Sequence, residues 1–251
     1  MIRVWLGRRS DRGPRWSRLT GFFILIVDPL LRRAIVQSVL GSAFFVAIVF
    51  GSARTWAYWQ GWTFLTVFEV STISFGVYLG RHDRALLERR MNAGPWNENE
   101  RAQKIIVSLV MLAFAACILL SVLDYRQGVS PVPAWVALAG NAVVAVSFLF
   151  IFTVLRVNTW AASNVAVEKD QQVVDTGPYA CVRHPMYAGA AMLFAGMPLA
   201  LGAWRPIVLL IPFLVILAWR LLDEETVLAR ELPGYVDYMS RVRYRLVPFV
   251  W

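Results

Sequence analysis

The chain has 251 residues, of which 58% are hydrophobic and 16% are charged, and its formal net charge is +9. This apolar share is too high for an ordinary soluble domain. Several apolar runs approach the length of about 20 residues that a helix needs to cross a bilayer. The composition therefore predicts an all-α fold, a polytopic helical bundle integral to the membrane.

The first 33 residues carry a series of arginines around a weak apolar stretch, residues 19–31. That stretch is too short to cross a bilayer and lacks a small-residue cleavage site, so it differs from a signal peptide. Arg8-Arg9 is followed by polar residues and makes a poor twin-arginine export signal. We expect residues 1–33 to form a basic arm at the membrane interface.

Six apolar runs follow, and each is predicted to be a membrane helix. They are residues 34–50, 59–79, 105–123, 134–155, 186–201 and 207–222. Four of them make a membrane region over residues 34–155, and residues 156–251 make a C-terminal unit. The last two runs are joined by a short turn and contain small residues such as Gly189 and Gly196, so they predict a tight helical hairpin.

Basic residues are distributed unevenly along this pattern. The N-terminal arm has 8, residues 81–104 have 6, residues 156–185 have 3 and the tail from Arg220 has 5, together 22 of the 25. The other side of the membrane keeps Arg54, Arg126 and Arg205. Because basic loops stay on the cytoplasmic side, both termini are predicted to be cytoplasmic and the protein to be integral to the inner membrane. The positive charge is then an orientation signal and a contact for anionic lipids, and no nucleic acid partner is expected.

Residues 176–189 combine a Gly-Pro turn, two cationic side chains and the start of an apolar run. Pro185 lacks a backbone donor and favours an extended conformation at His184. Arg183 and His184 are therefore presented from a non-helical entry into a helix, whose N-terminal end suits an anionic group such as a carboxylate. The alternative is a structural junction whose arginine reaches the lipid headgroups.

The last apolar run ends in Arg220 and three successive acidic residues, Asp223, Glu224 and Glu225. Arg220 and Glu224 are one helical turn apart, so an ion pair within the helix is the structural alternative to a functional role. Beyond a Pro-Gly break, tyrosines and arginines alternate with apolar residues in the amphipathic cytoplasmic tail. That tail is predicted either to dock on lipid headgroups or to cover a cofactor pocket.

Two further polar residues are candidates for contact with a substrate. Glu69 lies in the middle of the second apolar run, where a carboxylate is costly and indicates a functional role or a hydrogen-bonded packing contact. Asn158 follows the fourth run, where a helix cap is the simpler interpretation. The cysteines Cys117 and Cys181 are predicted to lie in a span and in a cytoplasmic loop, so no disulfide is expected.

Taken together, these motifs resemble the isoprenylcysteine carboxyl methyltransferase family and the related phospholipid N-methyltransferases. The resemblance covers about residues 154–251 and rests on two ordered motifs, Arg-His-Pro-x-Tyr-x-Gly and Glu-Glu, together with a matching tail. The residues that carry it are Gly177, Pro178, Tyr179, Val182, Arg183, His184, Pro185, Met186, Tyr187, Ala188, Gly189, Arg220, Glu224, Glu225, Leu228, Gly234, Tyr235, Tyr238, Tyr244, Arg245, Leu246, Val247 and Pro248.

The resemblance implies an integral membrane methyltransferase that uses S-adenosyl-L-methionine and needs no metal. It implies a cofactor site made of Gly177, Tyr179, Arg183, His184, Pro185, Tyr187, Gly189, Glu224, Glu225, Leu228, Tyr235 and Tyr238. Arg183 and His184 would bind the methionine carboxylate, and Glu224 or Glu225 the ammonium or the ribose hydroxyls. Arg220 and Glu224 are the catalytic candidates, with Arg220 fixing the carboxylates or orienting an anionic acceptor. No two glycines lie two residues apart, so the chain lacks the glycine-rich turn of a soluble dinucleotide site.

The methyl acceptor stays open between a lipophilic carboxylate, such as a prenylated cysteine, and a lipid amine. The main alternative activity is an NADPH-dependent sterol or isoprenoid reductase, because those membrane enzymes share a related C-terminal architecture. They usually have Asn after Arg-His-Pro and an acidic residue after the Gly, whereas this chain has Met186 and Ala190. A second alternative is a transporter or scaffold, for which Glu69 is the main support.

Overall fold

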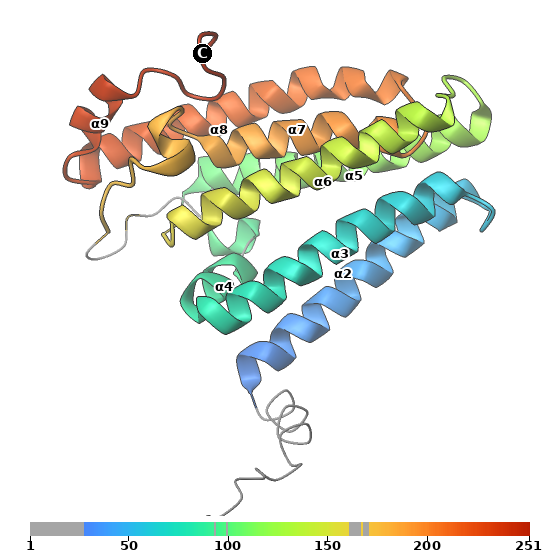
Figure 1. Cartoon of the computed structure of the whole chain (residues 1–251), viewed down its shortest axis with the longest axis horizontal. Helices are drawn as coiled ribbons and strands as arrows, with labels where there is room; N and C mark the ends of the chain where they lie inside the picture. Colours follow the sequence, from blue (N-terminus) through green and yellow to red (C-terminus); the bar gives the residue numbers. More distant parts are fainter. Residues whose placement is uncertain (1–27, 93, 99, 161–166, 168–170) are drawn as a thin grey trace, which may run out of the picture.

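The computed structural model describes residues 28–92, 94–98, 100–160, 167 and 171–251, and the predicted arm over residues 1–27 lies outside this part of the chain. The helices are α2 (Pro29–Ala53), α3 (Trp59–His82), α4 (Arg84–Met91), α5 (Arg101–Gln127), α6 (Ala134–Val157), α7 (Pro185–Ala200), α8 (Leu210–Glu231) and α9 (Tyr235–Arg241). Three short 3₁₀ turns complete them, η1 (Pro95–Asn97), η2 (Gly177–Ala180) and η3 (Arg205–Leu209). The prediction of an all-α polytopic bundle is confirmed (Figure 1).

Local sequence signals begin and end these helices. The Asp28 side chain accepts hydrogen bonds from the backbone N–H groups of Leu30 and Leu31, with Pro29 in the first turn of α2. The Asp83 side chain likewise accepts from the N–H of Leu86 at 2.9 Å and starts α4. At the other end of a helix, Gly128 ends α5 with a φ of 62°, a left-handed conformation that suits glycine.

Within the described residues, five helices are long and apolar enough to cross a membrane. They are Pro29–Ala53, Trp59–His82, Arg101–Gln127, Ala134–Val157 and, with η3, Arg205–Glu231. The predicted run 186–201 forms α7, which has 16 residues. At 1.5 Å per residue this helix is about 24 Å long, less than the hydrocarbon thickness of a bilayer. Of the six spans predicted from the sequence, five are thus long enough to cross a membrane, and the fifth in chain order, α7, is shorter.

Glycines bring α7 close to α6. A Cβ atom on Gly140 of α6 would lie 2.4 Å from the backbone N of Ala200, and one on Gly196 of α7 would lie 3.1 Å from the carbonyl O of Gly140. On the side of α8, Phe194 stacks on Phe213 with ring centroids 4.1 Å apart. The small residues that were expected to tighten the α7–α8 hairpin thus face α6, and aromatic packing joins α7 to α8. Because α7 lies among its neighbours, it does not need the full length of a lipid-exposed span.

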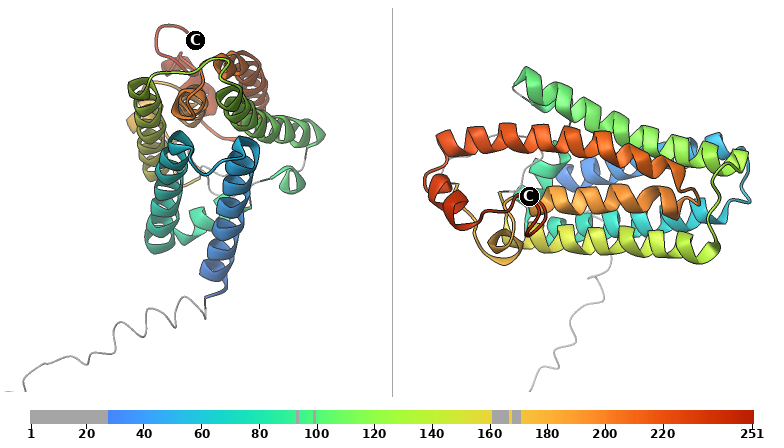
Figure 2. Two further views of the ribbon diagram at one scale, coloured as in Figure 1. Left: turned by 90° about the vertical axis from the view of Figure 1, so that its right-hand side faces the viewer. Right: turned by 90° about the horizontal axis from the view of Figure 1, so that it is seen from above.

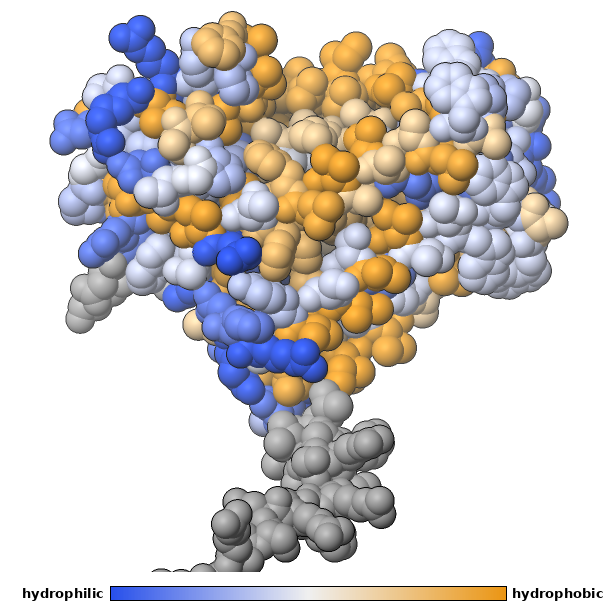
Figure 3. Space-filling model, viewed as in Figure 1, coloured by the Kyte–Doolittle hydropathy of each residue, from blue (hydrophilic) through white to orange (hydrophobic). Residues whose placement is uncertain are grey.

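The three connections α2–α3, α5–α6 and α7–α8 lie together at one end of the bundle (Figures 1 and 2). The backbone N–H of Val132 donates to the carbonyl of Gly202 at 3.2 Å, and Tyr58 donates its hydroxyl to the carbonyl of Leu201. The opposite end carries α4, η2 and α9. Figure 3 shows hydrophobic side chains gathered over the middle of the helices and hydrophilic ones concentrated near α4 and α9. The three arginines that lie outside the basic segments, Arg54, Arg126 and Arg205, are therefore at the end of the bundle with these three connections.

Candidate active site

A cavity of about 1450 Å³ lies between the α2–α3 pair and the remaining helices. Over much of its length the wall is apolar and includes the aromatic residues Phe44, Phe68, Phe75, Phe114, Phe148 and Phe213. Near α4 and α9 the wall becomes polar and includes Asn158, Tyr179, Arg183, His184, Tyr187, Arg220, Glu224, Tyr235 and Tyr238. Ten of the fifteen candidate residues of the sequence analysis, these nine and Leu228, therefore meet on one surface.

The Arg-His-Pro motif adopts the conformation that its sequence predicts. Gly177 begins η2 with a φ of 58°, which favours glycine, and a Cβ there would lie 3.0 Å from Val157. His184 has a φ of −125° and immediately precedes α7, which begins at Pro185. The backbone N–H groups of Arg183 and His184 donate to the carbonyls of Tyr244 and Arg245, both at 2.9 Å. The tail therefore uses two of the backbone donors that precede this helix.

Glu225 joins the motif to the tail. Its Oε1 accepts from Nε of Arg183 at 2.7 Å and lies 3.2 Å from Nε2 of His184, while its Oε2 accepts from Nε of Arg245 at 3.0 Å. Arg183, His184 and Glu225 are all buried. A buried carboxylate is stable only when it is paired and hydrogen-bonded, and this one has partners on both oxygens. We call these four residues the Glu225 cluster.

A second polar group is organised by Tyr187 on α7. The Tyr187 hydroxyl donates to Oε2 of Glu224 and accepts from Nε of Arg220 at 3.1 Å. Arg220 also donates to Oε1 of Gln103 at 2.6 Å and to Oε1 of Glu98 at 3.2 Å. The sequence suggested a direct pair between Arg220 and Glu224, whereas here Tyr187 connects them. Unlike Glu225, Glu224 lines the cavity.

The aromatic residues of the tail close the polar end. The Tyr238 hydroxyl donates to the carbonyl of Tyr179 at 2.8 Å, which anchors α9 on η2. The Tyr235 hydroxyl is buried and makes no hydrogen bond with the residues that the structure describes. Burial raises the pKa of Tyr235 well above its ordinary value, so the phenol keeps its proton. A buried donor without a partner on a cavity wall indicates a place for a ligand oxygen or nitrogen.

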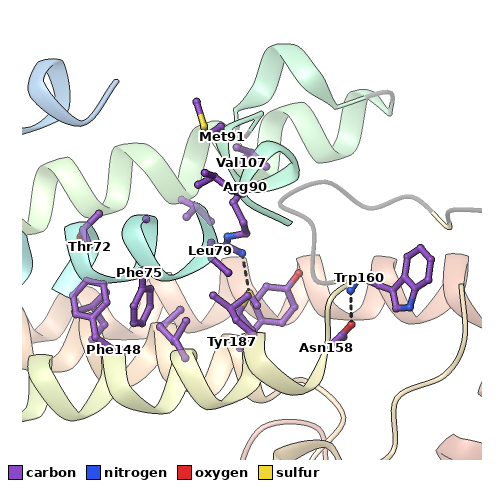
Figure 4. A pocket seen from close by; sticks show the side chains of 18 of the residues that line it. Thr72, Phe75, Leu79, Arg90, Met91, Val107, Phe148, Asn158, Trp160 and Tyr187 are labelled. Atoms are coloured by element: carbon purple, nitrogen blue, oxygen red, sulfur yellow. Dashed lines mark hydrogen bonds between the residues drawn. The ribbon is translucent and has the colours of Figure 1, made fainter. Parts of the chain in front are cut away.

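Asn158 combines the two roles that its sequence position suggested. It follows α6 as the C-terminal cap residue, and its Oδ1 accepts from the backbone N–H of Trp160 at 3.0 Å. Its Nδ2 lies 2.9 Å from the Tyr179 hydroxyl at the cavity wall. Burial raises the pKa of Tyr179 to about 12, so this phenol is neutral at physiological pH. Figure 4 shows the Asn158–Trp160 contact on the side of the cavity away from α3.

Five sequence candidates lie away from the cavity surface. Gly177, Pro185 and Gly189 shape the backbone of the motif. Glu225 does not line the cavity and is hydrogen-bonded to Arg183 within the Glu225 cluster. The fifth, Glu69, lies between α3 and α2, where its Oε2 accepts a hydrogen bond from Ser42 at 2.7 Å. This pairing matches the packing alternative for Glu69. A direct contact of these five with a substrate or cofactor stays a prediction.

Three residues that the fold brings to the site were not predicted from the sequence. They are Glu98 and Gln103, which bind Arg220, and Arg90, which lines the cavity. Arg245 was part of the matching tail, and the structure adds its contact with Glu225. Glu98 precedes a membrane span in a charged loop, where acidic residues are ordinarily solvated. Its burial to 4% exposure was therefore not visible in the sequence.

The family model described as phospholipid methyltransferase matches residues 134–233. This part of the chain is similar to phospholipid methyltransferases. The match runs from the start of α6 to the turn after α8, so it contains the Arg-His-Pro motif, Tyr187, Arg220 and both glutamates. No curated protein matches the chain. The match supports the resemblance to phospholipid methyltransferases, and membership of the isoprenylcysteine carboxyl methyltransferase family stays a prediction.

Proposed function

We propose that the protein is an integral membrane methyltransferase that transfers the methyl group of S-adenosyl-L-methionine to a lipophilic acceptor. The observation that supports this most directly is the continuity of the cavity, in which an apolar section meets a polar end built from both motifs. A lipid can enter the apolar section from the bilayer, while a polar cofactor binds at the end near α9. The similarity to phospholipid methyltransferases supports the reaction class.

The polar end has groups of the types that the cofactor requires. The ammonium and hydroxyl groups of the cofactor need hydrogen-bond acceptors, and Glu224 is available on the cavity wall. The carboxylate of the cofactor needs donors, and His184 and Arg220 lie on the same wall. The unpaired Tyr235 hydroxyl adds a donor. When bound, the cofactor supplies an electrophilic methyl group on a sulfonium, which is already a good leaving group.

The residues of this chain then have to orient the acceptor and exclude water, since alignment of the two reactants is the larger part of the task. An amine acceptor must lose a proton before or during attack, whereas a carboxylate is already ionised. Glu224 is the group on the wall that can accept that proton. Tyr187 acts as a positioning residue, because its hydroxyl contacts both Glu224 and the Arg220 guanidinium.

The test is calorimetric binding of S-adenosylhomocysteine and of NADPH to the detergent-purified protein. We expect S-adenosylhomocysteine to bind and Glu224→Gln to weaken it, because Glu224 lines the cavity. Glu231→Gln is the matched control, since Glu231 is exposed at the end of the same helix and pairs with Arg230. Binding of NADPH instead would identify a reductase, and binding of neither would refute both enzymatic functions.

A further inference from the structure

Arg90 differs from the other arginines that line the cavity. It lies in the last turn of α4 and extends toward Tyr187 of α7 (Figure 4). Within the described part of the chain, its guanidinium makes one hydrogen bond, from Nη1 to the thioether sulfur of Met186 at 3.2 Å. By contrast, Arg183 and Arg220 are paired with the carboxylates of Glu225 and Glu98.

A thioether is a weak acceptor and carries no charge, so it does not compensate a guanidinium. Arg90 also interacts electrostatically with the phenols of Tyr179 and Tyr187, but a phenol is neutral in its ordinary protonation state. Burial lowers the pKa of Arg90, yet an arginine side chain stays protonated in proteins. Arg90 is half-buried, and a cation that is partly removed from water without a counter-ion is costly. The arrangement therefore favours an occupant of the cavity that brings a negative charge.

The surroundings of Arg90 indicate what else that occupant must have. Leu79 and Leu87 lie in the buried cluster at the α3–α4 corner, with Met91 and Met186 packed against it. From this corner the apolar wall continues along α2 and α3. Arg90 thus lies where the apolar section meets the polar end. A ligand that satisfies both surfaces has an oxyanion attached to a long apolar chain.

We propose that Arg90 binds the oxyanion, phosphodiester or carboxylate, of an amphiphile whose apolar chain lies against α2 and α3. As a statement about the methyl acceptor, this inference rests on the proposed function. The cofactor carboxylate has its own candidate donors on α7 and α8, on the other wall of the cavity. The volume of about 1450 Å³ also exceeds the roughly 300–1,000 Å³ of sites for one drug-sized ligand, which leaves room for a second occupant.

The experiment measures lipid binding and cofactor binding separately in detergent. The change in tryptophan fluorescence on adding a probe reports on the cavity, because Trp96 and Trp160 line it. The two probes that carry an oxyanion, called the anionic probes here, are the zwitterion dioctanoyl phosphatidylethanolamine and the carboxylate dodecanoate. Dioctanoylglycerol is the analogue without an oxyanion. Arg90→Gln is expected to lower the binding affinity of one or both anionic probes by about 10- to 100-fold and to leave the affinity for dioctanoylglycerol unchanged. Whichever anionic probe responds identifies the headgroup as phosphodiester or carboxylate.

Arg81→Gln is the matched control, since Arg81 is exposed at the end of α3 and does not line the cavity. Arg90→Lys keeps the charge and should restore part of the affinity. Equal binding of the anionic probes by Arg90→Gln and the wild type would overturn the inference. Competition by inorganic phosphate alone at the same concentration as the lipid would also overturn it, because the apolar chain would then contribute nothing.

S-adenosylhomocysteine separates this inference from the proposed function. If it binds the wild type and Arg90→Gln equally while the anionic probes discriminate, both proposals stand. If Arg90→Gln loses S-adenosylhomocysteine, then Arg90 belongs to the cofactor site and the inference is wrong. If the wild type does not bind S-adenosylhomocysteine but the anionic probes discriminate, the proposed function fails and Arg90 remains a lipid site.

Discussion

The Nε atom of Arg183 lies 2.7 Å from Oε1 of Glu225, across 42 residues of sequence, and both side chains are more than nine-tenths buried. This ion pair joins the start of α7 to α8. Since Arg245 binds the second oxygen of Glu225, the tail is joined to the same point. The pair that the sequence resemblance assigns to cofactor binding thus also connects three segments of the C-terminal unit.

Glu225→Gln should destabilise the protein by about 3–5 kcal/mol, because it leaves the buried Arg183 guanidinium without its counter-ion. Thermal unfolding in detergent measures this loss. Asp175→Asn is the control, since Asp175 pairs with Arg241 on the surface with side-chain exposures of 38% and 60%. An exposed pair contributes about 0–1 kcal/mol. Equal effects of the two substitutions would contradict a structural role for Glu225.

Tyr187→Phe removes the hydroxyl that donates to Glu224 and accepts from Arg220. We expect kcat to fall by about 10- to 100-fold with a smaller change in KM, as for the loss of a hydrogen bond to a charged group. Tyr78→Phe is the control on α3, outside the cavity wall. A change in KM alone would mean that Tyr187 only binds a ligand.

Gly140→Ala should destabilise the bundle by about 1–3 kcal/mol, the usual cost of overpacking. Its new Cβ would lie 2.4 Å from the backbone N of Ala200, and a backbone atom cannot rotate away. Gly51→Ala is matched to it, because a Cβ on Gly51 of α2 would have no neighbour within 4 Å. Thermal stability in detergent compares the two. Retention of wild-type stability by Gly140→Ala would show that α6 and α7 are farther apart than described.

Glu69→Gln is expected to leave kcat and KM within about twofold, because the amide oxygen can still accept from Ser42. Glu69→Leu would leave the Ser42 hydroxyl without this partner and cost roughly 1 kcal/mol of stability. Activity assays and thermal unfolding of the two variants separate these effects. A large loss of activity in a folded Glu69→Gln protein would favour the substrate role suggested by its position in the span.

The sequence was sufficient to predict the elements and the two motifs, because each rests on a local signal. Apolar runs determine the spans, Pro185 fixes the start of α7, and the tyrosine-rich tail was placed near the motifs. The hydrogen-bond partners of Arg220 could not be predicted from the sequence, for a physical reason. Glu98 and Gln103 meet Arg220 across more than a hundred residues, and this depends on how α5 and α8 are rotated. Membrane helices are apolar on most sides, so hydropathy gives little information on that rotation.

Arg90 was missed for a related reason. In the sequence it is one of several basic residues in the loop 81–104, and that loop was used only to orient the chain. Its place on the cavity wall follows from the packing of α4 beneath α3, where Leu86 and Leu87 are buried. Residue type and loop charge do not distinguish it from the exposed Arg81.

The cavity wall has two origins along the chain. The polar end comes largely from residues 134–233 and the tail, whereas α2, α3 and α4 provide the opposite side, including Arg90. On the proposed function and the proposed role of Arg90, the reaction chemistry and the choice of acceptor would be encoded in separate segments. Exchange of the segment 29–91 between relatives should therefore transfer the preference for a lipid while the methyl-transfer apparatus is retained.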